Sequence, residues 1–157
     1  MSMLVLVVSD SHGNVENMCR AVELTRPALL LHLGDGWRDA AALARRFPDL
    51  PVERVPGNCD FLANERAERV MELEGKRVML CHGHTLGVKT DLGMLLRAAL
   101  AREADAVLFG HTHKPLVDIR RGVVMLNPGS VGDRVRPTYG TLTFTDGNCV
   151  GATHLLK

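Results

Sequence analysis

The stretch LVLVVSDSH, residues 4–12, decides the fold, because five apolar residues run directly into Asp10, Ser11 and His12. An apolar run of this length is typical of a buried strand. The polar residues then stand at the end of that strand, which is where the loops of α/β proteins carry their chemistry. We therefore expect a central sheet whose strand ends carry a functional site.

The same combination recurs along the chain. Four further apolar runs are each followed by a polar cluster: 29–33 by Gly34-Asp35-Gly36, 52–55 by Gly57-Asn58-Cys59-Asp60, 78–80 by Cys81-His82-Gly83-His84, and 106–109 by Gly110-His111-Thr112-His113. Asp10 and His12 are two residues apart, so their side chains point the same way if strand geometry persists, and His111 and His113 share this spacing. The clusters predict one polynuclear metal site assembled from segments distant in sequence.

The order of the predicted elements indicates the fold class. We expect strands at 4–9, 29–33 and 52–55, separated by helices at about 14–25 and 37–47 that end before Pro27 and Pro48. The second half predicts hairpins within 69–81, 117–126 and 141–154, a strand at 106–110 and a long helix at 89–104. This order favours an α/β protein in which two sheets pack face to face with helices outside.

The composition is that of an ordinary globular protein. With 157 residues, 46% hydrophobic, 24% charged and a net charge of +1, the chain predicts a single domain over 1–157 and no surface for long nucleic acid or membranes. The aromatic fraction of 4% argues against a stacking platform for single strands. The four cysteines form no C-x-x-C pair, and signal peptide and membrane span are both missing, so we expect a cytoplasmic protein.

The candidate ligands form a mixed nitrogen and oxygen set. It comprises two carboxylates, one amide and four imidazoles: Asp10, Asp35, Asn58, His12, His82, His111 and His113. Such a set suits Mn²⁺, Fe, Zn²⁺ or Ni²⁺, and differs from a cysteine-rich structural zinc site and from an all-oxygen Ca²⁺ or Mg²⁺ cage. Seven donors exceed what one tetrahedral ion needs and suit two ions that share a carboxylate.

The motifs Asp-x-His, Gly-Asp, Gly-Asn-x-Asp, Cys-His and Gly-His-x-His, followed by Asn-Pro-Gly-Ser at 127–130, resemble those of the calcineurin-like metallophosphoesterases. The chain is most similar to the small single-domain phosphodiesterase branch of that superfamily. The resemblance implies a four-layer α/β/β/α sandwich with two mixed sheets and a dimetal site at the strand ends. It further implies two ions, Mn²⁺ being the first expectation. Asp10, His12, Asp35 and His113 would hold one, while Asp35 bridges to the other, completed by Asn58, His82 and His111.

This ligand set suggests phosphate chemistry. Two divalent ions, two carboxylates and a bridging hydroxide leave a local charge of about +1, which attracts an anion. We expect the hydroxide to attack phosphorus in small or activated phosphodiesters. A phosphomonoesterase or nuclease is the alternative within the class, and a retromer-subunit-like protein-binding scaffold is the alternative outside it. A homo-oligomer is compatible with the sequence, although no apolar stripe specifies one.

Cys59 departs from the family pattern. Many larger relatives carry there a histidine that is credited with protonating the leaving group. A thiol with an ordinary pKa near 8.5 is a poor substitute for a contribution that is typically worth 10²–10⁴-fold. We therefore expect a preference for good leaving groups, or another donor such as His84 or a metal-bound water. Asp35, Asn58 and His82 are the expected catalytic ligands, and Asp60 is expected to orient a ligand.

Overall fold

The computed structural model describes residues 2–61, 63 and 65–157 and arranges them in two five-stranded sheets with three α-helices. The first sheet has the order β10-β9-β1-β2-β3 and the second β4-β5-β6-β8-β7. The elements are β1 (Ser2–Val8), α1 (Val15–Thr25), β2 (Leu29–His32), α2 (Trp37–Arg46), β3 (Val52–Arg54), β4 (Glu68–Leu73), β5 (Lys76–Cys81), a 3₁₀ turn η1 (His84–Leu86), α3 (Gly93–Ala101), β6 (Ala106–Leu108), β7 (Leu116–Arg120), β8 (Val123–Asn127), β9 (Thr138–Thr145) and β10 (Asn148–Leu155).

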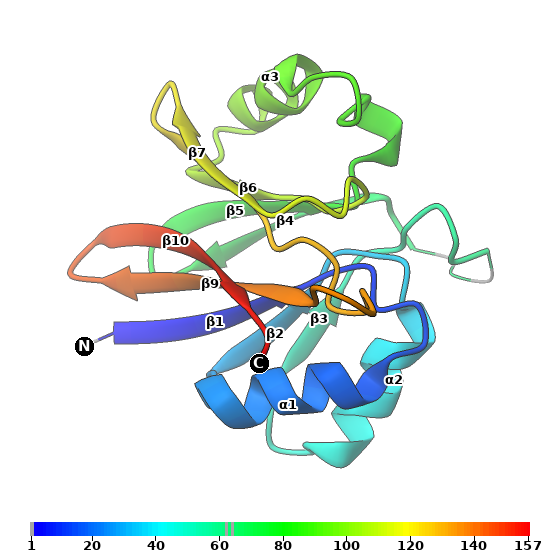
Figure 1. Cartoon of the computed structure of the whole chain (residues 1–157). Coiled ribbons are helices and arrows are strands. Elements are labelled where there is room, and N and C mark those ends of the chain that lie inside the picture. The colour runs from blue at the N-terminus through cyan, green and yellow to red at the C-terminus, as the bar shows by residue number, and fades with distance from the viewer. Residues whose placement is uncertain (1, 62, 64) are drawn as a thin grey trace.

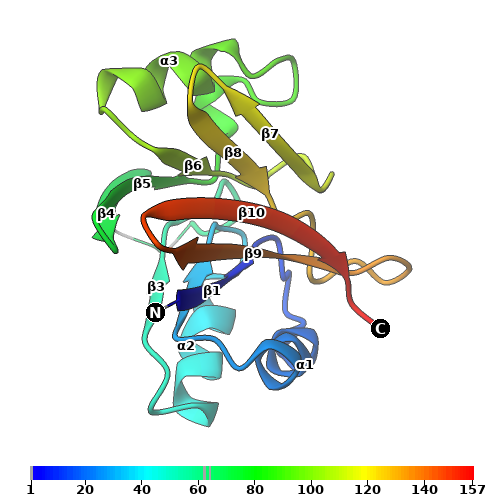
Figure 2. The same ribbon diagram turned by 90° about the vertical axis from the view of Figure 1, so that its left-hand side faces the viewer.

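The two sheets face each other, with α1 and α2 outside the first and α3 outside the second (Figure 1). In the first sheet β1, β2 and β3 are parallel, and in the second β5, β6 and β8 are parallel. The remaining strands pair antiparallel with their neighbours, and β10 contacts β7 and β8 across the sandwich (Figure 2). The predicted α/β/β/α sandwich of two mixed sheets is confirmed.

Burial on both faces of the central strands explains their continuous apolar runs. In β1, Val5 and Val7 belong to the core between the sheets, whereas Leu6 and Val8 belong to the core beneath α1 and α2. This division follows the two-residue alternation of a strand. A third core lies under α3, where Leu95 is fully buried. The three apolar cores therefore hold the four layers together.

The predicted hairpins are confirmed, each with a two-residue turn that ends in glycine. Both turn residues have positive φ in all three hairpins: Glu74 (51°) and Gly75 (78°), Arg121 (51°) and Gly122 (79°), and Asp146 (49°) and Gly147 (80°). Positive φ at both positions belongs to the turn type whose twist matches that of paired strands.

The helix expected over 89–104 is shorter, since α3 covers only Gly93–Ala101. Before it, the amides of Thr90 and Asp91 donate to the carbonyl of Gly87, and the Asp91 carboxylate accepts from the amide of Gly93. These local bonds form a turn and delay the start of the helix. Among the described residues, no helix has both the length and the apolar character that a membrane crossing requires.

Candidate metal centre

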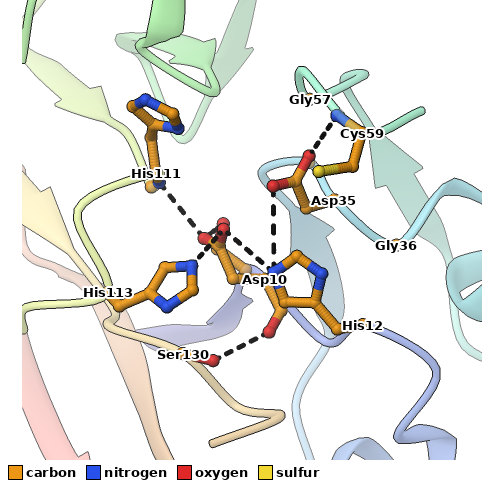
Figure 3. Close-up of polar contacts among 12 residues, drawn as sticks. Asp10, His12, Asp35, Gly36, Gly57, Cys59, His111, His113 and Ser130 are labelled. Carbon is orange, nitrogen blue, oxygen red and sulfur yellow. Dashed lines mark hydrogen bonds and ion pairs between the residues drawn. The ribbon is translucent and has the colours of Figure 1, made fainter. Parts of the chain in front are cut away.

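The polar clusters follow the carboxyl ends of the parallel strands of both sheets, β1, β2 and β3 in one and β5 and β6 in the other. Such strand ends meet at one edge and commonly carry the site of an α/β protein. His12 and His113, from different sheets, approach Asp10 from opposite sides (Figure 3). The structure thus joins segments about a hundred residues apart in sequence, as the linkage of His113 to Asp10 demonstrates.

The donor atoms of these side chains lie close together. Nε2 of His113 is 3.0 Å from Oδ1 of Asp10, and Nε2 of His82 is 3.4 Å from Oδ2 of Asp35. Nδ1 of His111 is 3.2 Å from Nε2 of His82. Atoms that share one ion at about 2.1 Å lie roughly 3.0–4.2 Å apart, so these separations fit neighbouring metal ligands.

Two imidazoles lie within reach of both carboxylates. Nε2 of His12 is 3.7 Å from Asp10 and 3.8 Å from Asp35. Nε2 of His82 is 3.8 Å from Asp10 and 3.4 Å from Asp35. The donors form overlapping groups, one of Asp10, His12 and His113 and another of Asp10, Asp35 and His82. The candidate donors therefore form one continuous cluster.

Asn58 lies on the loop after β3, next to Cys59. Its side chain is exposed, and its amide nitrogen lies 3.7 Å from the sulfur of Cys59. Its role as a ligand stays a prediction. Cys59 lies beside the candidate ligands, because its sulfur is within 4.8 Å of donor atoms of His12 and Asp35. The thiol therefore adjoins the candidate ligands.

The two carboxylates are buried, Asp10 completely and Asp35 with 5% exposure. Asp10 accepts hydrogen bonds from the Ser9 hydroxyl at 2.6 Å and the His111 amide at 3.1 Å. Asp35 accepts from the Cys59 amide at 2.8 Å. Among the described residues their ion-pair partners are histidines only, with no Lys or Arg. Paired buried carboxylates of this kind need positive charge nearby, and a bound divalent ion supplies it.

His82 is prepared for metal binding by a backbone contact. Its Nδ1 lies 2.8 Å from the Leu33 carbonyl, to which only a protonated nitrogen can donate, so Nε2 faces the carboxylates. Burial lowers the pKa of His82, but the Asp35 hydrogen bond and the charges of Asp10 and Asp35 raise it more. Burial also raises the pKa of Asp35, yet hydrogen bonds from His82 and Cys59 hold it well below its ordinary value. Asp35 is therefore an ionised candidate ligand.

Asp60 fixes the loop that carries Asp35, as expected for an orienting residue. Its carboxylate accepts hydrogen bonds from four backbone amides, those of Asp35, Gly36, Trp37 and Gly57, at 2.8–3.1 Å. Gly57 is required by the close approach of the two loops, because a Cβ there would lie 2.2 Å from Oδ1 of Asp35. The loops after β2 and β3 therefore act as one unit.

The backbone of the cluster is unusual as well. Five candidate ligands have left-handed φ angles: Asp10 (55°), His12 (44°), Asp35 (57°), His111 (70°) and His113 (63°). Residues with side chains rarely adopt this region, and its concentration at one place is typical of functional sites. The loops thus turn sharply enough for each donor to face the centre.

A buried network around His32 lies behind these loops and was not predicted. Nδ1 of His32 accepts from the Gly34 amide at 3.1 Å, and Nε2 is 2.9 Å from the Ser11 hydroxyl. That hydroxyl donates to Asp39 at 2.6 Å. Burial lowers the pKa of His32 to about 4, so its ring is neutral and braces the loop. The feature of the sequence that could have indicated this network is a histidine, His32, inside the apolar run 29–33.

His84 lies beside the cluster, with its ring 5.5 Å from that of His82 and 6.2 Å from that of His111. Its Nδ1 is buried and has no hydrogen-bond partner among the described residues. Burial first, and the charge of His82 second, lower the pKa of His84.

The Asn127–Ser130 segment supports the backbone of a candidate ligand, because the Ser130 hydroxyl donates a hydrogen bond to the Asp10 carbonyl at 2.8 Å.

Comparison with known proteins agrees with this geometry. The model of the calcineurin-like phosphoesterase superfamily domain matches residues 3–147. The probable metallophosphoesterase YsnB of Bacillus subtilis is 36% identical over 148 residues, covering 90% of this chain and 84% of that protein. The phosphodiesterase YfcE of Escherichia coli is 30% identical over 154 residues, covering 82% of this chain and 79% of that protein.

A solved structure supports the fold independently. The crystal structure of a predicted phosphoesterase from Streptococcus pneumoniae superimposes with a TM-score of 0.83 at 24% identity, covering 99% of this chain and 90% of that one. Two mixed sheets flanked by helices are therefore common to both proteins. Sequence matches over most of the chain and the clustered ligands lead to one conclusion: this chain belongs to the calcineurin-like phosphoesterase superfamily and is a metal-dependent phosphoesterase.

Proposed function

We propose that the chain is a two-metal phosphodiesterase that hydrolyses small or activated phosphodiesters. The observation that carries this proposal is the shared position of His12 and His82, each within 3.8 Å of both Asp10 and Asp35. Such sharing is compatible with two adjoining ions between the carboxylates. When bound, a pair of ions supplies a clamp for the phosphoryl oxygens and an activated water for attack on phosphorus.

The chain's own residues divide between the two ions. Asp10, His12 and His113 would hold the first, and His82, His111 and Asn58 the second, with Asp35 shared. The mixed nitrogen and oxygen donors support a transition ion, with Mn²⁺ proposed first and Ni²⁺, Zn²⁺ or Fe as alternatives. His82 contributes a fixed orientation through Leu33, and Asp35 contributes a permanent negative charge.

The leaving group faces a weak acid in this site. Burial first, and the charge of Asp35 second, raise the pKa of the Cys59 thiol in the metal-free chain. A thiol is nevertheless a weak hydrogen-bond donor. His84, whose buried Nδ1 has no hydrogen-bond partner among the described residues, is the second candidate to hold or transfer the proton. This arrangement favours esters whose leaving groups need little protonation.

The test combines metal analysis with hydrolysis of bis(4-nitrophenyl) phosphate by the metal-loaded protein. The wild type is expected to hold two ions per chain and to cleave the diester, while Asp35→Asn and His82→Ala lose at least about 100-fold in kcat/KM. Asp133→Asn is the matched control, because this carboxylate is exposed. A wild type that binds no metal and is as inert as the variants contradicts the proposal and favours a non-catalytic scaffold.

The same assay addresses the alternatives within the class. A phosphomonoesterase would prefer 4-nitrophenyl phosphate, and a nuclease would prefer oligonucleotides, over the small diester. We expect the diester to give the highest kcat/KM. Light scattering of the same sample measures whether the chain forms the homo-oligomer that remains a prediction.

A further inference from the structure

A cavity of about 340 Å³ opens directly beside the candidate metal centre. Its lining includes His12, Asp35 and Cys59 from the candidate centre and the aromatic residues Trp37 and Phe61. Its volume is at the lower end of small-molecule pockets, which measure about 300–1,000 Å³. A phosphate group at the centre would therefore have room on this side for one small ester substituent.

Aromatic side chains are scarce in this protein, yet two of them, Trp37 and Phe61, line this cavity. The chain has one tryptophan, one tyrosine and four phenylalanines. Phe61 is 89% exposed, the highest value among the exposed large hydrophobic side chains that the structure describes. An apolar ring left in water beside a reactive site is available to cover a ligand.

Trp37 forms a fixed counterpart to the exposed ring. The guanidinium of Arg54 lies 3.6 Å from the centre of the Trp37 ring and also donates to the Trp37 carbonyl. The electrostatic attraction between a cation and the face of an aromatic ring stabilises the position of the Trp37 ring. The cavity therefore combines a braced aromatic wall with a solvent-exposed ring.

Besides the candidate ligand Asp35, the cavity is lined by two carboxylates, Asp39 and Asp60, and both already have partners. Asp60 accepts from four amides, and Asp39 accepts from the Ser11 hydroxyl at 2.6 Å and the Gly13 amide at 2.8 Å. Their negative charge is thus offset by donors of the protein. The lining also includes the cation Arg38, so a cationic substituent is not demanded.

We propose that this cavity binds an aromatic ring carried by one ester substituent of the phosphodiester, an inference that rests on the proposed function. The phosphate would lie by Asp35 and Cys59, and the ring would pack between Trp37 and Phe61. A nucleobase and a simple aryl group share this chemistry. The volume of the cavity suits one such ring, so we expect a substrate of the size of a mononucleotide ester.

The experiment measures binding and needs no turnover. Metal-loaded protein is titrated calorimetrically with phenylphosphonate, methylphosphonate and the phosphonate analogue of adenosine monophosphate, none of which carries a cleavable ester. Stacking of one ring predicts at least about five-fold tighter binding of the ring-bearing ligands than of methylphosphonate. Because Trp37 is the single tryptophan, its fluorescence should change with the ring-bearing ligands only.

Variants assign the effect to the cavity. Phe61→Ala is expected to reduce the preference for rings, and Phe61→Tyr, which keeps a ring, to retain it. Ile119→Ala is the matched control, since Ile119 is also exposed, at 66%, but lies on β7. A gain for the adenosine ligand alone identifies a nucleobase, whereas equal gains for both ring-bearing ligands identify aryl groups in general.

The outcomes separate this inference from the proposed function. Equal affinities for all three phosphonates in the wild type, or an unchanged preference in Phe61→Ala, overturn the ring-binding role even if diesters are hydrolysed. If the ring preference and its loss in Phe61→Ala are observed but no diester is cleaved, the cavity stands and the proposed hydrolysis fails.

Discussion

Replacing Asp60 by asparagine tests how the ligand-bearing loops are held. Oδ2 of Asp60 accepts from the amides of Asp35 and Gly57, both at 2.8 Å, and Oδ1 accepts from Gly36 at 3.1 Å and Trp37 at 3.0 Å. Asparagine keeps one acceptor oxygen, so at least two amides lose their partner. Hydrogen bonds to a charged group contribute about 1.5–3 kcal/mol each, and the half-buried setting favours the lower value, so the expected loss is about 3 kcal/mol.

Urea denaturation of the metal-free protein measures this loss as a lower free energy of unfolding, and calorimetry measures Mn²⁺ binding. Because Asp60 positions the amide of Asp35, we expect metal affinity to fall by about 10–100-fold. Asp133→Asn is the matched control: its carboxylate accepts from two amides at 2.8 Å but is exposed, and both quantities should change little. An Asp60→Asn protein with wild-type stability and metal affinity would refute the reasoning.

Three further predictions follow from single contacts. Burial lowers the pKa of His32 from 6.5 to about 4, so the unfolded chain binds a proton at this residue more readily than the folded protein. The free energy of unfolding should therefore fall by about 3 kcal/mol between pH 6.5 and 4. Urea unfolding midpoints measured across that range should fall more steeply with decreasing pH in the wild type than in His32→Asn. Cys59→His should raise kcat/KM for diesters with poor leaving groups by about 10²–10⁴-fold, and Cys59→Ser should not. Gly57→Ala should abolish Mn²⁺ binding measured by calorimetry, because the added Cβ meets Oδ1 of Asp35 at 2.2 Å, whereas Gly151→Ala, with its nearest atom at 3.4 Å, should leave it intact.

Each of these has a result that would contradict it. For His32, an equal pH dependence in wild type and variant would mean that other groups carry the acid sensitivity. For Cys59, a histidine variant with an unchanged dependence on leaving-group pKa would show that proton donation is not limiting. For Gly57, wild-type metal affinity in the alanine variant would show that the two loops can separate.

Much of the fold could be predicted because local signals and burial agree. The run 4–8 reads as a strand since both faces of β1 are buried, and the Glu74-Gly75 turn has the glycine that its backbone requires. The start of α3 could not be predicted, because the apolar spacing continues through residues that form a hydrogen-bonded turn before the helix. Asp91, which bonds the amide of Gly93, shows this competition.

The candidate site was predictable to the extent that its donors follow strand ends. The supporting contacts were not, because they join elements that only the folded chain brings together. Ser11, His32 and Asp39 come from the loop after β1, from β2 and from α2, and only His32, a histidine inside an apolar run, stands out in sequence. The cavity at Trp37 and Phe61 likewise depends on how two loops meet.

The left-handed backbone at the five candidate ligands has a consequence for evolution in the laboratory. Each such residue stores roughly 1–3 kcal/mol, which a glycine at the same position would release. A glycine at His12 or His113 would thus be expected to make the metal-free protein more heat-resistant while removing a donor. Selection for heat resistance alone would enrich inactive variants, so any thermostability screen of this chain has to be coupled to turnover.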